Sequence, residues 1–195
     1  AQEILGGQAA ASVLAMDDPA IMGQLQPLFS SGLFRVYTND DIAGCELGGV
    51  LKNVIAIACG MGDGMGAGDN TRAAMITRGL AEITRLGTAL GGKAETFAGL
   101  AGMGDLVTTC ASPLSRNRYV GEQLGRGRAI AEIVREMHTV AEGVWSAPVI
   151  VELAAQHAVP VPMMQEVNRV LAGGNMKQAF RALLRISAGA ETDPG

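Results

Sequence analysis

Residues 44–60 read Gly-Cys-Glu-Leu-Gly-Gly-Val-Leu-Lys-Asn-Val-Ile-Ala-Ile-Ala-Cys-Gly, and this stretch decides the fold. It predicts a helix that is apolar nearly all round and therefore buried. One ammonium group, that of Lys52, stands in the middle. At about 100° per residue, its face of the helix carries small residues that leave room for a ligand, namely Cys45, Gly48, Gly49, Ala56 and Cys59. A buried lysine needs a carboxylate partner or a catalytic task, whereas the alternative is a lysine that extends along the surface.

The composition favours a mainly helical protein. Hydrophobic residues make up 48% of the 195, aromatic residues only 4%, and there are 27 glycines, which suits closely packed helices better than a β-sandwich. The net charge of −4 argues against a nucleic-acid-binding surface. Neither a signal peptide nor an uninterrupted apolar run of about 18 residues is present. We therefore expect no membrane span and a cytoplasmic location, with the three cysteines reduced.

The residues before this helix predict a short β-α-β unit. Residues 9–16 and 33–38 have the composition of strands, and Asp18-Pro19 begins a helix that extends to about Phe29. Two strands alone are marginally stable, so residues 1–38 are interpreted as the end of a larger α/β domain. Residues 39–188 are predicted to be all-helical, with helices at 69–90, 94–99, 104–110, 115–124, 129–137, 140–157, 162–171 and 176–186. Residues 189–195 are predicted to be a flexible tail.

One glycine-rich run imitates a nucleotide-binding loop. Gly62 to Ala67 fits the pattern G-x-G-x-x-A, and Glu82 follows at about the distance of a ribose-binding acid. The preceding stretch contains Lys52 and Asn53, however, and no β-branched strand follows. We therefore favour a flexible turn at residues 60–68 that lets helices cross closely.

Two further stretches carry polar chemistry. Asp105 and Thr109 are four residues apart and share a helical face, although Asp105 is equally well explained as a helix cap. Ser115, Arg116 and Asn117 stand where a helix begins, a combination that suits a phosphate, although a solvated helix start is the more common case. His138 and Glu142 have no third ligand nearby, so no metal site is predicted.

Taken in order, these motifs resemble one family. Gly48–Ala56, Gly102–Cys110 and Ser115–Arg118 are similar in sequence and spacing to NAD(P)-dependent glycerol-3-phosphate dehydrogenase of the bacterial type, and residues 33–39 and 139–143 extend the similarity. The resemblance implies a helical C-terminal domain like that of 6-phosphogluconate dehydrogenase, preceded by the end of a Rossmann domain. The family's glycine-rich nucleotide loop and its first catalytic-site lysine have no counterpart in this chain.

The resemblance also implies roles for single residues. Dihydroxyacetone phosphate and sn-glycerol 3-phosphate would be interconverted with NAD(P)H, for phospholipid synthesis, and a homodimer is expected. The implied catalytic residues are Lys52, as acid/base, Asp105 and Thr109. The implied substrate contacts are Lys52, Asn53, Asp105, Ser115, Arg116 and Asn117, and the implied cofactor contacts are Ala1, Arg116, Val140 and Glu142.

Other functions stay open on the sequence alone. The chain is also compatible with the helical domain of a related hydroxyacid dehydrogenase, or with a helical dimerisation module that has lost catalysis. The Ser-Arg-Asn-Arg run favours a phosphorylated substrate over a plain carboxylate. The preference between NAD and NADP depends on a residue that this sequence does not contain.

Overall fold

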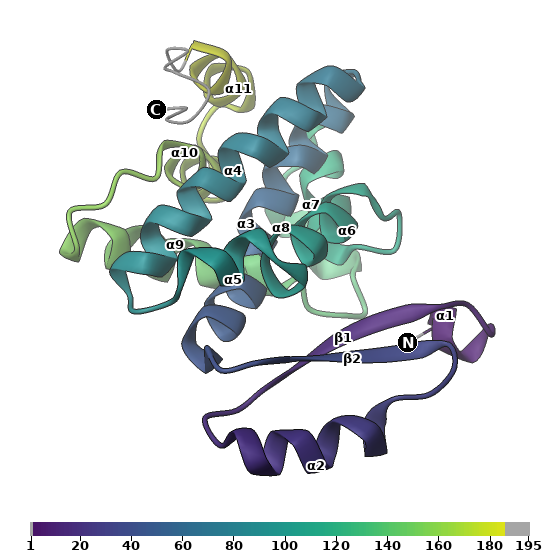
Figure 1. Cartoon of the computed structure of the whole chain (residues 1–195). Helices are drawn as coiled ribbons and strands as arrows, with labels where there is room; N and C mark the ends of the chain where they lie inside the picture. Colours follow the sequence, from purple (N-terminus) through teal and green to yellow (C-terminus); the bar gives the residue numbers. More distant parts are fainter. Residues whose placement is uncertain (1, 186–195) are drawn as a thin grey trace.

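A computed structural model describes residues 2–185, so Ala1 and the expected tail at 189–195 lie outside the described residues. The prediction of a mainly helical chain with a short β-α-β unit is confirmed (Figure 1). The elements are α1 (Gln2–Leu5), β1 (Ala10–Ala15), α2 (Pro19–Phe29), β2 (Phe34–Asn39), α3 (Ile42–Gly64), α4 (Asp69–Ala89), α5 (Ala94–Ala98), the π-helical turn η1 (Leu100–Gly104), α6 (Asp105–Ala111), α7 (Arg116–Gly125), α8 (Ile130–Glu136), α9 (Glu142–Gln156), α10 (Pro162–Leu171) and α11 (Met176–Arg185).

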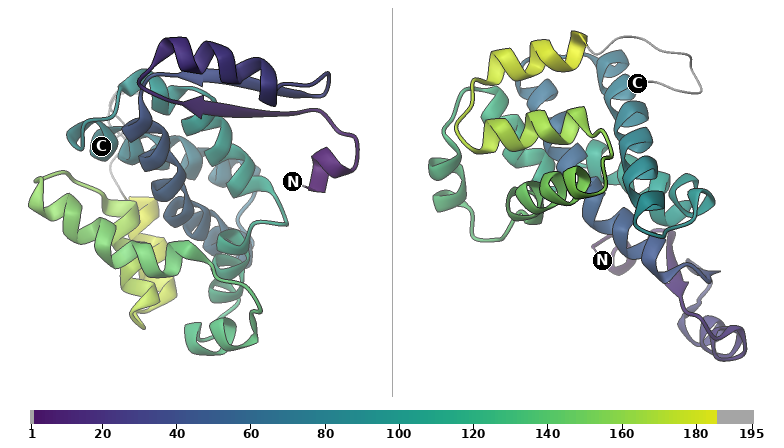
Figure 2. Two further views of the ribbon diagram at one scale, coloured as in Figure 1. Left: turned by 90° about the horizontal axis from the view of Figure 1, so that it is seen from below. Right: turned by 90° about the vertical axis from the view of Figure 1, so that its left-hand side faces the viewer.

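The β-α-β unit forms from local signals. Asp18 caps α2, because its Oδ1 accepts hydrogen bonds from the backbone N–H groups of Ala20 (2.8 Å) and Ile21 (3.1 Å), and Pro19 occupies the first helical position. β1 and β2 pair in parallel, from Ala10 opposite Phe34 to Ala15 opposite Asn39. The sheet and α2 extend from one end of the helical part, as the two further views show (Figure 2).

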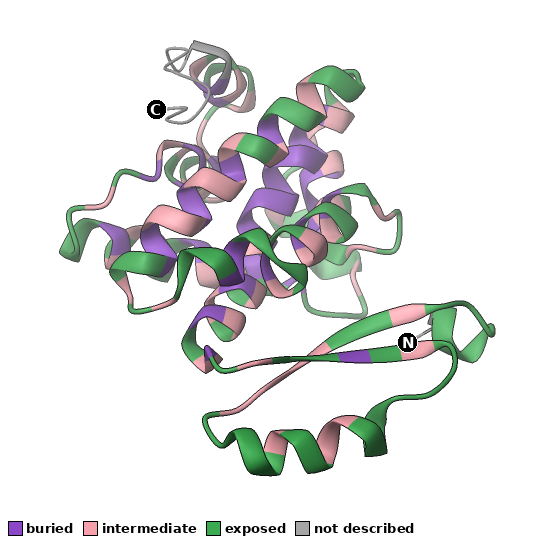
Figure 3. Ribbon diagram, in the orientation of Figure 1, coloured by how far each residue is buried: buried purple, intermediate pink, exposed green. Residues whose placement is uncertain are grey.

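Helix α3 is the centre of the helical part. Thirteen of its residues are buried, among them an unbroken run from Asn53 to Gly62. The other helices pack around it, so that burial is concentrated on α3 and on the faces that surround it (Figure 3). By length and composition alone α3 is apolar enough to cross a membrane, but 56% of its most apolar stretch is buried inside the protein. The length, apolar composition and burial of α3 are those of a helix in a protein core.

The prediction of a turn at residues 60–68 was wrong in its first half. α3 continues to Gly64, and the connection to α4 is Met65–Gly68. Gly60 and Gly64 lie against α7, where a Cβ on Gly60 would stand 2.0 Å from the carbonyl oxygen of Arg118. The α7 glycines Gly121 and Gly125 lie equally close to α3. These glycines therefore allow a close helix crossing, as predicted, but from inside two helices.

Candidate functional site

The carboxylate partner expected for Lys52 is Asp105. The Nζ of Lys52, in α3, donates to Oδ2 of Asp105, at the start of α6. The Lys52 side chain is 18% exposed and that of Asp105 is 40% exposed, so one edge of the ion pair is open to a ligand. Thr109, one turn along α6, donates its hydroxyl to the backbone oxygen of Asp105 (2.6 Å), and its Oγ1 is also within 3.4 Å of Asp105 Oδ1. The structure thus brings these three predicted residues together.

The backbone before Asp105 explains how the pair forms. Residues 100–103, which were predicted to connect two helices, form with Gly104 the π-helical turn η1 against α3. A Cβ on Gly48 would stand 2.9 Å from the carbonyl oxygen of Ala101, so the glycine allows η1 to approach α3 closely. η1 then continues directly into α6, which places Asp105 over Lys52.

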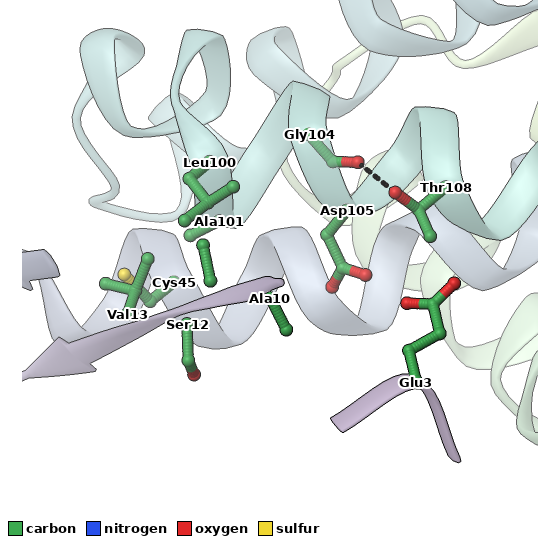
Figure 4. A pocket seen from close by; sticks show the side chains of 11 residues that line it. Glu3, Ala10, Ser12, Val13, Cys45, Leu100, Ala101, Gly104, Asp105 and Thr108 are labelled. Carbon is green, nitrogen blue, oxygen red and sulfur yellow. Dashed lines mark hydrogen bonds between the residues drawn. The ribbon is translucent and has the colours of Figure 1, made fainter. Parts of the chain in front are cut away.

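A pocket of about 490 Å³ opens beside this pair, between η1, α6 and strand β1 (Figure 4). Asp105 and Thr108 line one side, and Glu3, Ala10 and Ser12 line the other. The carboxylates of Glu3 and Asp105 face the same space (Figure 4). The pocket therefore lies where the β-α-β unit meets the helical part.

The predicted anion-binding residues lie at the start of α7. Ser115 is its N-cap, since its Oγ accepts from the N–H of Arg118 (3.2 Å). The guanidinium of Arg116 is 46% exposed and lies 3.4 Å from the Glu142 carboxylate. Ser115 and Arg116 line a second pocket, of about 280 Å³, together with Tyr119. A hydroxyl, a guanidinium and the positive end of a ten-residue helix meet there, as an anion requires.

Asn53 and Asn117 follow Lys52 and Arg116 in sequence. Both are buried, with 9% and 4% of their surface exposed. Nδ2 of Asn117 donates to Oδ1 of Asn53 (3.0 Å), and Oδ1 of Asn117 accepts from the N–H of Gly143 (2.9 Å). Nδ2 of Asn53 donates to the carbonyl oxygen of Gly49 (3.3 Å). Both side-chain oxygens thus accept hydrogen bonds inside the protein. Gly143, whose N–H donates one of these bonds, was not singled out from the sequence.

A second group that the sequence reasoning missed is centred on Asp63. Its buried carboxylate accepts hydrogen bonds from Nε and Nη2 of Arg72 (3.0 and 2.6 Å) and from Nε of Arg118 (2.8 Å). Nη2 of Arg118 also lies 2.8 Å from this carboxylate. The hydrogen bonds that Arg72 donates to the Asp63 carboxylate raise the pKa of Arg72. Asp63 thereby ties α4 and α7 to the end of α3. Asp63 was predicted to lie in a turn, and only the continuation of α3 to Gly64 shows that its charge belongs to a largely apolar helix.

The residues that the resemblance assigns to the cofactor lie at the surface of the helical part. Arg116, Val140 and Glu142 are exposed. The Arg116 guanidinium lies beside the Glu142 carboxylate, and Val140 is two residues before Glu142 in sequence. A guanidinium beside a carboxylate suits phosphate and ribose hydroxyl groups.

The Gly62–Ala67 pattern spans the end of α3 and the turn after it, which is no phosphate loop. Glu82 is buried and accepts from the N–H groups of Met163 (2.7 Å) and Met164 (3.2 Å), so it caps α10. Among residues 2–185 no group of three or more His, Cys, Asp or Glu side chains is arranged for a metal ion.

Comparison with known proteins decides the family. Residues 41–181 match the family model for the C-terminus of NAD-dependent glycerol-3-phosphate dehydrogenase. The chain belongs to this family. It is 62% identical over its whole length to glycerol-3-phosphate dehydrogenase [NAD(P)+] 2 of Sphingopyxis alaskensis, and 51% identical over 98% of its length to a glycerol-3-phosphate dehydrogenase [NAD(P)+] of Mycobacterium avium.

Solved glycerol-3-phosphate dehydrogenases share the fold. The crystal structure of the Coxiella burnetii enzyme matches 94% of this chain with a TM-score of 0.89 and 41% identity. The chain spans 59% of the Sphingopyxis protein, 56% of the Mycobacterium protein and 57% of the Coxiella chain. It therefore corresponds to somewhat more than half of the length of these glycerol-3-phosphate dehydrogenases.

Proposed function

We propose that this chain is the substrate-binding part of an enzyme that interconverts dihydroxyacetone phosphate and sn-glycerol 3-phosphate with NAD(P)H, and so supplies glycerophospholipid synthesis. The observation that carries the proposal is the partly buried Lys52–Asp105 ion pair, whose Asp105 side chain lines a pocket. Membership of the glycerol-3-phosphate dehydrogenase family supports the reaction and the NAD(P) cofactor.

Lys52 is the proposed general acid. When a ketone is reduced, negative charge develops on its oxygen, and a positioned ammonium stabilises this charge and donates the proton. Asp105 holds the Lys52 ammonium on the open side of α3, and Thr109 holds Asp105. The nicotinamide cofactor, when bound, supplies the hydride. In the reverse direction the neutral amine of Lys52 takes up the hydroxyl proton.

Ser115 and Arg116 are the proposed phosphate ligands. The Ser115 oxygen accepts from Arg118, which leaves its hydroxyl hydrogen to donate to an anion. Arg116 adds a planar fork of N–H donors that fits a phosphate. Asn53 and Asn117 are proposed to belong to the same substrate site, which is supported by the hydrogen bond between their side chains and by their position next to Lys52 and Arg116 in sequence.

Residues 1–38 are proposed to end a nucleotide-binding domain, and residues 39–188 to form the substrate domain. Arg116, Val140 and Glu142 are proposed to contact the nucleotide from the substrate domain. Ala1 is proposed to contact it from the nucleotide-binding domain. A homodimer and a cytoplasmic location complete the proposal.

The test compares two substrates on the enzyme at its natural length. Arg116→Ala should raise the KM for dihydroxyacetone phosphate strongly while it changes kcat/KM for unphosphorylated dihydroxyacetone little, because the lost interaction is with the phosphate. Arg126→Ala removes an exposed arginine that directly follows the last residue of the same helix and should leave both values unchanged. Equal losses on both substrates would remove Arg116 from the phosphate site, and a wild type inactive on dihydroxyacetone phosphate would refute the proposed reaction.

A further inference from the structure

One face of α3 presents few side chains to the segment that follows α4. Gly44, Gly48 and Lys52 follow one another at intervals of four residues and so share this face. A Cβ on Gly44 would stand 3.0 Å from Cγ2 of Thr96, and a Cβ on Gly48 would stand 2.9 Å from the carbonyl oxygen of Ala101. α5 and η1 therefore lie directly on the α3 backbone. They run in the same direction as α3, because later residues of α3 meet later residues of this segment.

Such a smooth face fixes how close the two elements are but not their register. Interlocking side chains usually prevent packed helices from sliding, and Gly44 and Gly48 have none. The ion pair of Lys52 with Asp105, at the far end of the contact, is a weak anchor, because 40% of the Asp105 side chain is exposed and solvent screens such pairs. The register therefore depends on another contact.

That contact is the buried carboxylate of Asp41, where both elements begin. Asp41 is 5% exposed and is the N-cap of α3, since its Oδ1 accepts from the N–H of Gly44 (2.8 Å). Its Oδ2 accepts from the N–H of Lys93, the N-cap residue of α5 (2.7 Å). Burial raises the pKa of Asp41, but the hydrogen bonds outweigh burial and hold it below its usual value. The carboxylate is therefore charged, and hydrogen bonds to a charged acceptor are strong.

We propose that Asp41 is a positioning residue that sets the register between α3 and residues 93–105, and hence the place of Asp105 over the Lys52 ammonium. This inference rests on the proposed function, in which Lys52 is the general acid. If the start of α5 slides along α3, η1 and α6 follow, because they continue directly from it. A misplacement of about 1 Å at the reacting groups costs up to about 10²-fold in rate.

Lys93→Pro in the enzyme at its natural length is the primary test. Proline removes the N–H that Asp41 accepts, while Asp41 and its bond to Gly44 remain. Lys93 has φ −87° and ψ 135°, close to the range of proline. We expect kcat for dihydroxyacetone phosphate to fall about 10- to 100-fold, with KM changed less than about threefold. The loss in kcat should be equal on unphosphorylated dihydroxyacetone, because the phosphate end at Arg116 is unaffected.

Lys93→Ala is the matched control at the same position. It removes the same side chain, including the exposed ion pair with Asp40 (2.8 Å), but keeps the backbone N–H. Its kcat should equal that of the wild type, because exposed ion pairs contribute little. An unchanged kcat in Lys93→Pro, an equal loss in Lys93→Ala, or a rise in KM alone would each overturn the positioning role of Asp41.

Lys93→Pro combined with Lys52→Ala separates positioning from a general loss of structure. If Asp41 acts through Lys52, adding Lys93→Pro to Lys52→Ala should lower kcat by less than about twofold more. A general structural defect would instead add its full loss, and that result would overturn the inference. Normal kcat in Lys52→Ala alone would refute the proposed function. If Lys52→Ala loses kcat and Lys93→Pro does not, only the positioning role fails.

Asp41→Ser keeps the inference testable if Lys93→Pro does not fold. Serine is a good N-cap residue for α3, but it has one side-chain oxygen in place of two and cannot also accept from Lys93. We expect the same loss of kcat as in Lys93→Pro. Glu82→Gln changes another buried carboxylate that accepts two backbone N–H groups, and it should leave kcat unchanged. Normal kcat in Asp41→Ser, or an equal loss in Glu82→Gln, would overturn the inference.

Discussion

The β-α-β unit and the helical part are stabilised in different ways. In the helical part, Leu51, Val54 and Ile55 of α3 are at most 1% exposed and lie in a continuous core. Of residues 3–39, Val36 alone is buried, and Phe29 is 56% exposed. The unit nevertheless has a capped helix and a complete two-strand register. Local signals are thus sufficient to define elements, but they do not supply the apolar burial that stabilises a domain.

The residues proposed to act on the substrate follow the same division. Lys52, Asp105 and Arg116 all belong to the helical part, whereas β1 and α1 contribute the opposite wall of one pocket. The rigid core positions the polar groups, and the β-α-β unit limits the space beside them. The predictions below test this division, beginning with the largest effect.

Lys52→Ala should have the largest effect. In the enzyme at its natural length, kcat should fall by about 10²- to 10⁴-fold, because the ammonium acts on charge that develops in the transition state. Lys177→Ala, which removes a lysine from the exposed face of α11, is the control and should be neutral. Near-normal turnover by Lys52→Ala would show that the ion pair with Asp105 is only structural.

The same substitution in the two regions should differ sharply in stability. Phe97→Ala empties a fully buried position and should lower the free energy of unfolding by about 3–5 kcal/mol. Phe29→Ala, at an exposed position of α2, should change it by no more than about 0.5 kcal/mol. Denaturant unfolding of the 195-residue chain measures both. Similar losses at the two positions would show that the β-α-β unit shares the core.

A buried carboxylate should make the stability of the helical part depend on pH. Burial raises the pKa of Glu82 from 4.5 to about 7, against the opposing effect of the two N–H groups that it accepts from. Between these values the folded chain keeps a proton that the unfolded chain releases. The free energy of unfolding should therefore fall as the pH rises from about 4.5 to about 7, by about 3 kcal/mol at about 1.4 kcal/mol per pH unit.

Glu82→Gln should remove this dependence, because glutamine keeps an acceptor oxygen for the start of α10 but does not titrate. Glu95→Gln, at an exposed position of α5, is the control and should retain the wild-type slope. Unfolding curves at several pH values between 4 and 8 measure the slope. A wild-type stability that rises over this range would contradict the assigned direction.

The sequence predicted those features that depend on neighbouring residues. Asp18 and Pro19 defined the start of α2, and the composition of residues 44–60 identified the core helix together with the need of Lys52 for a partner. The predicted end of α3 was wrong, because Gly60 and Gly64 belong to the helix and not to the turn expected at residues 60–68. Whether a glycine bends a helix or allows another helix to approach depends on that other helix, here α7, more than 50 residues away.

The partners of buried polar groups were not predictable in the same way. Asn117 bonds to Asn53, 64 residues earlier, and to Gly143, 26 residues later. Asp63 bonds to Arg118, 55 residues later. No sequence spacing encodes such contacts, because they depend on how three helices cross. Residue type indicates that a buried amide or carboxylate needs partners, and the fold determines which ones it has.

The smallest effect expected is an absence of binding. The 195-residue chain should show no appreciable affinity for NAD(H) by calorimetry, because Arg116, Val140 and Glu142 are the only residues among 2–185 that we propose as nucleotide contacts. Gly62 and Gly64, which imitate a phosphate loop in sequence, lie within α3, and their backbone N–H groups are part of that helix. The enzyme at its natural length should bind the dinucleotide, and Arg116→Ala should weaken that binding. Micromolar affinity of the 195-residue chain would contradict the division, because the helical part would then hold the cofactor without a nucleotide-binding domain. A β-α-β unit with one buried side chain gives no reason to expect that result.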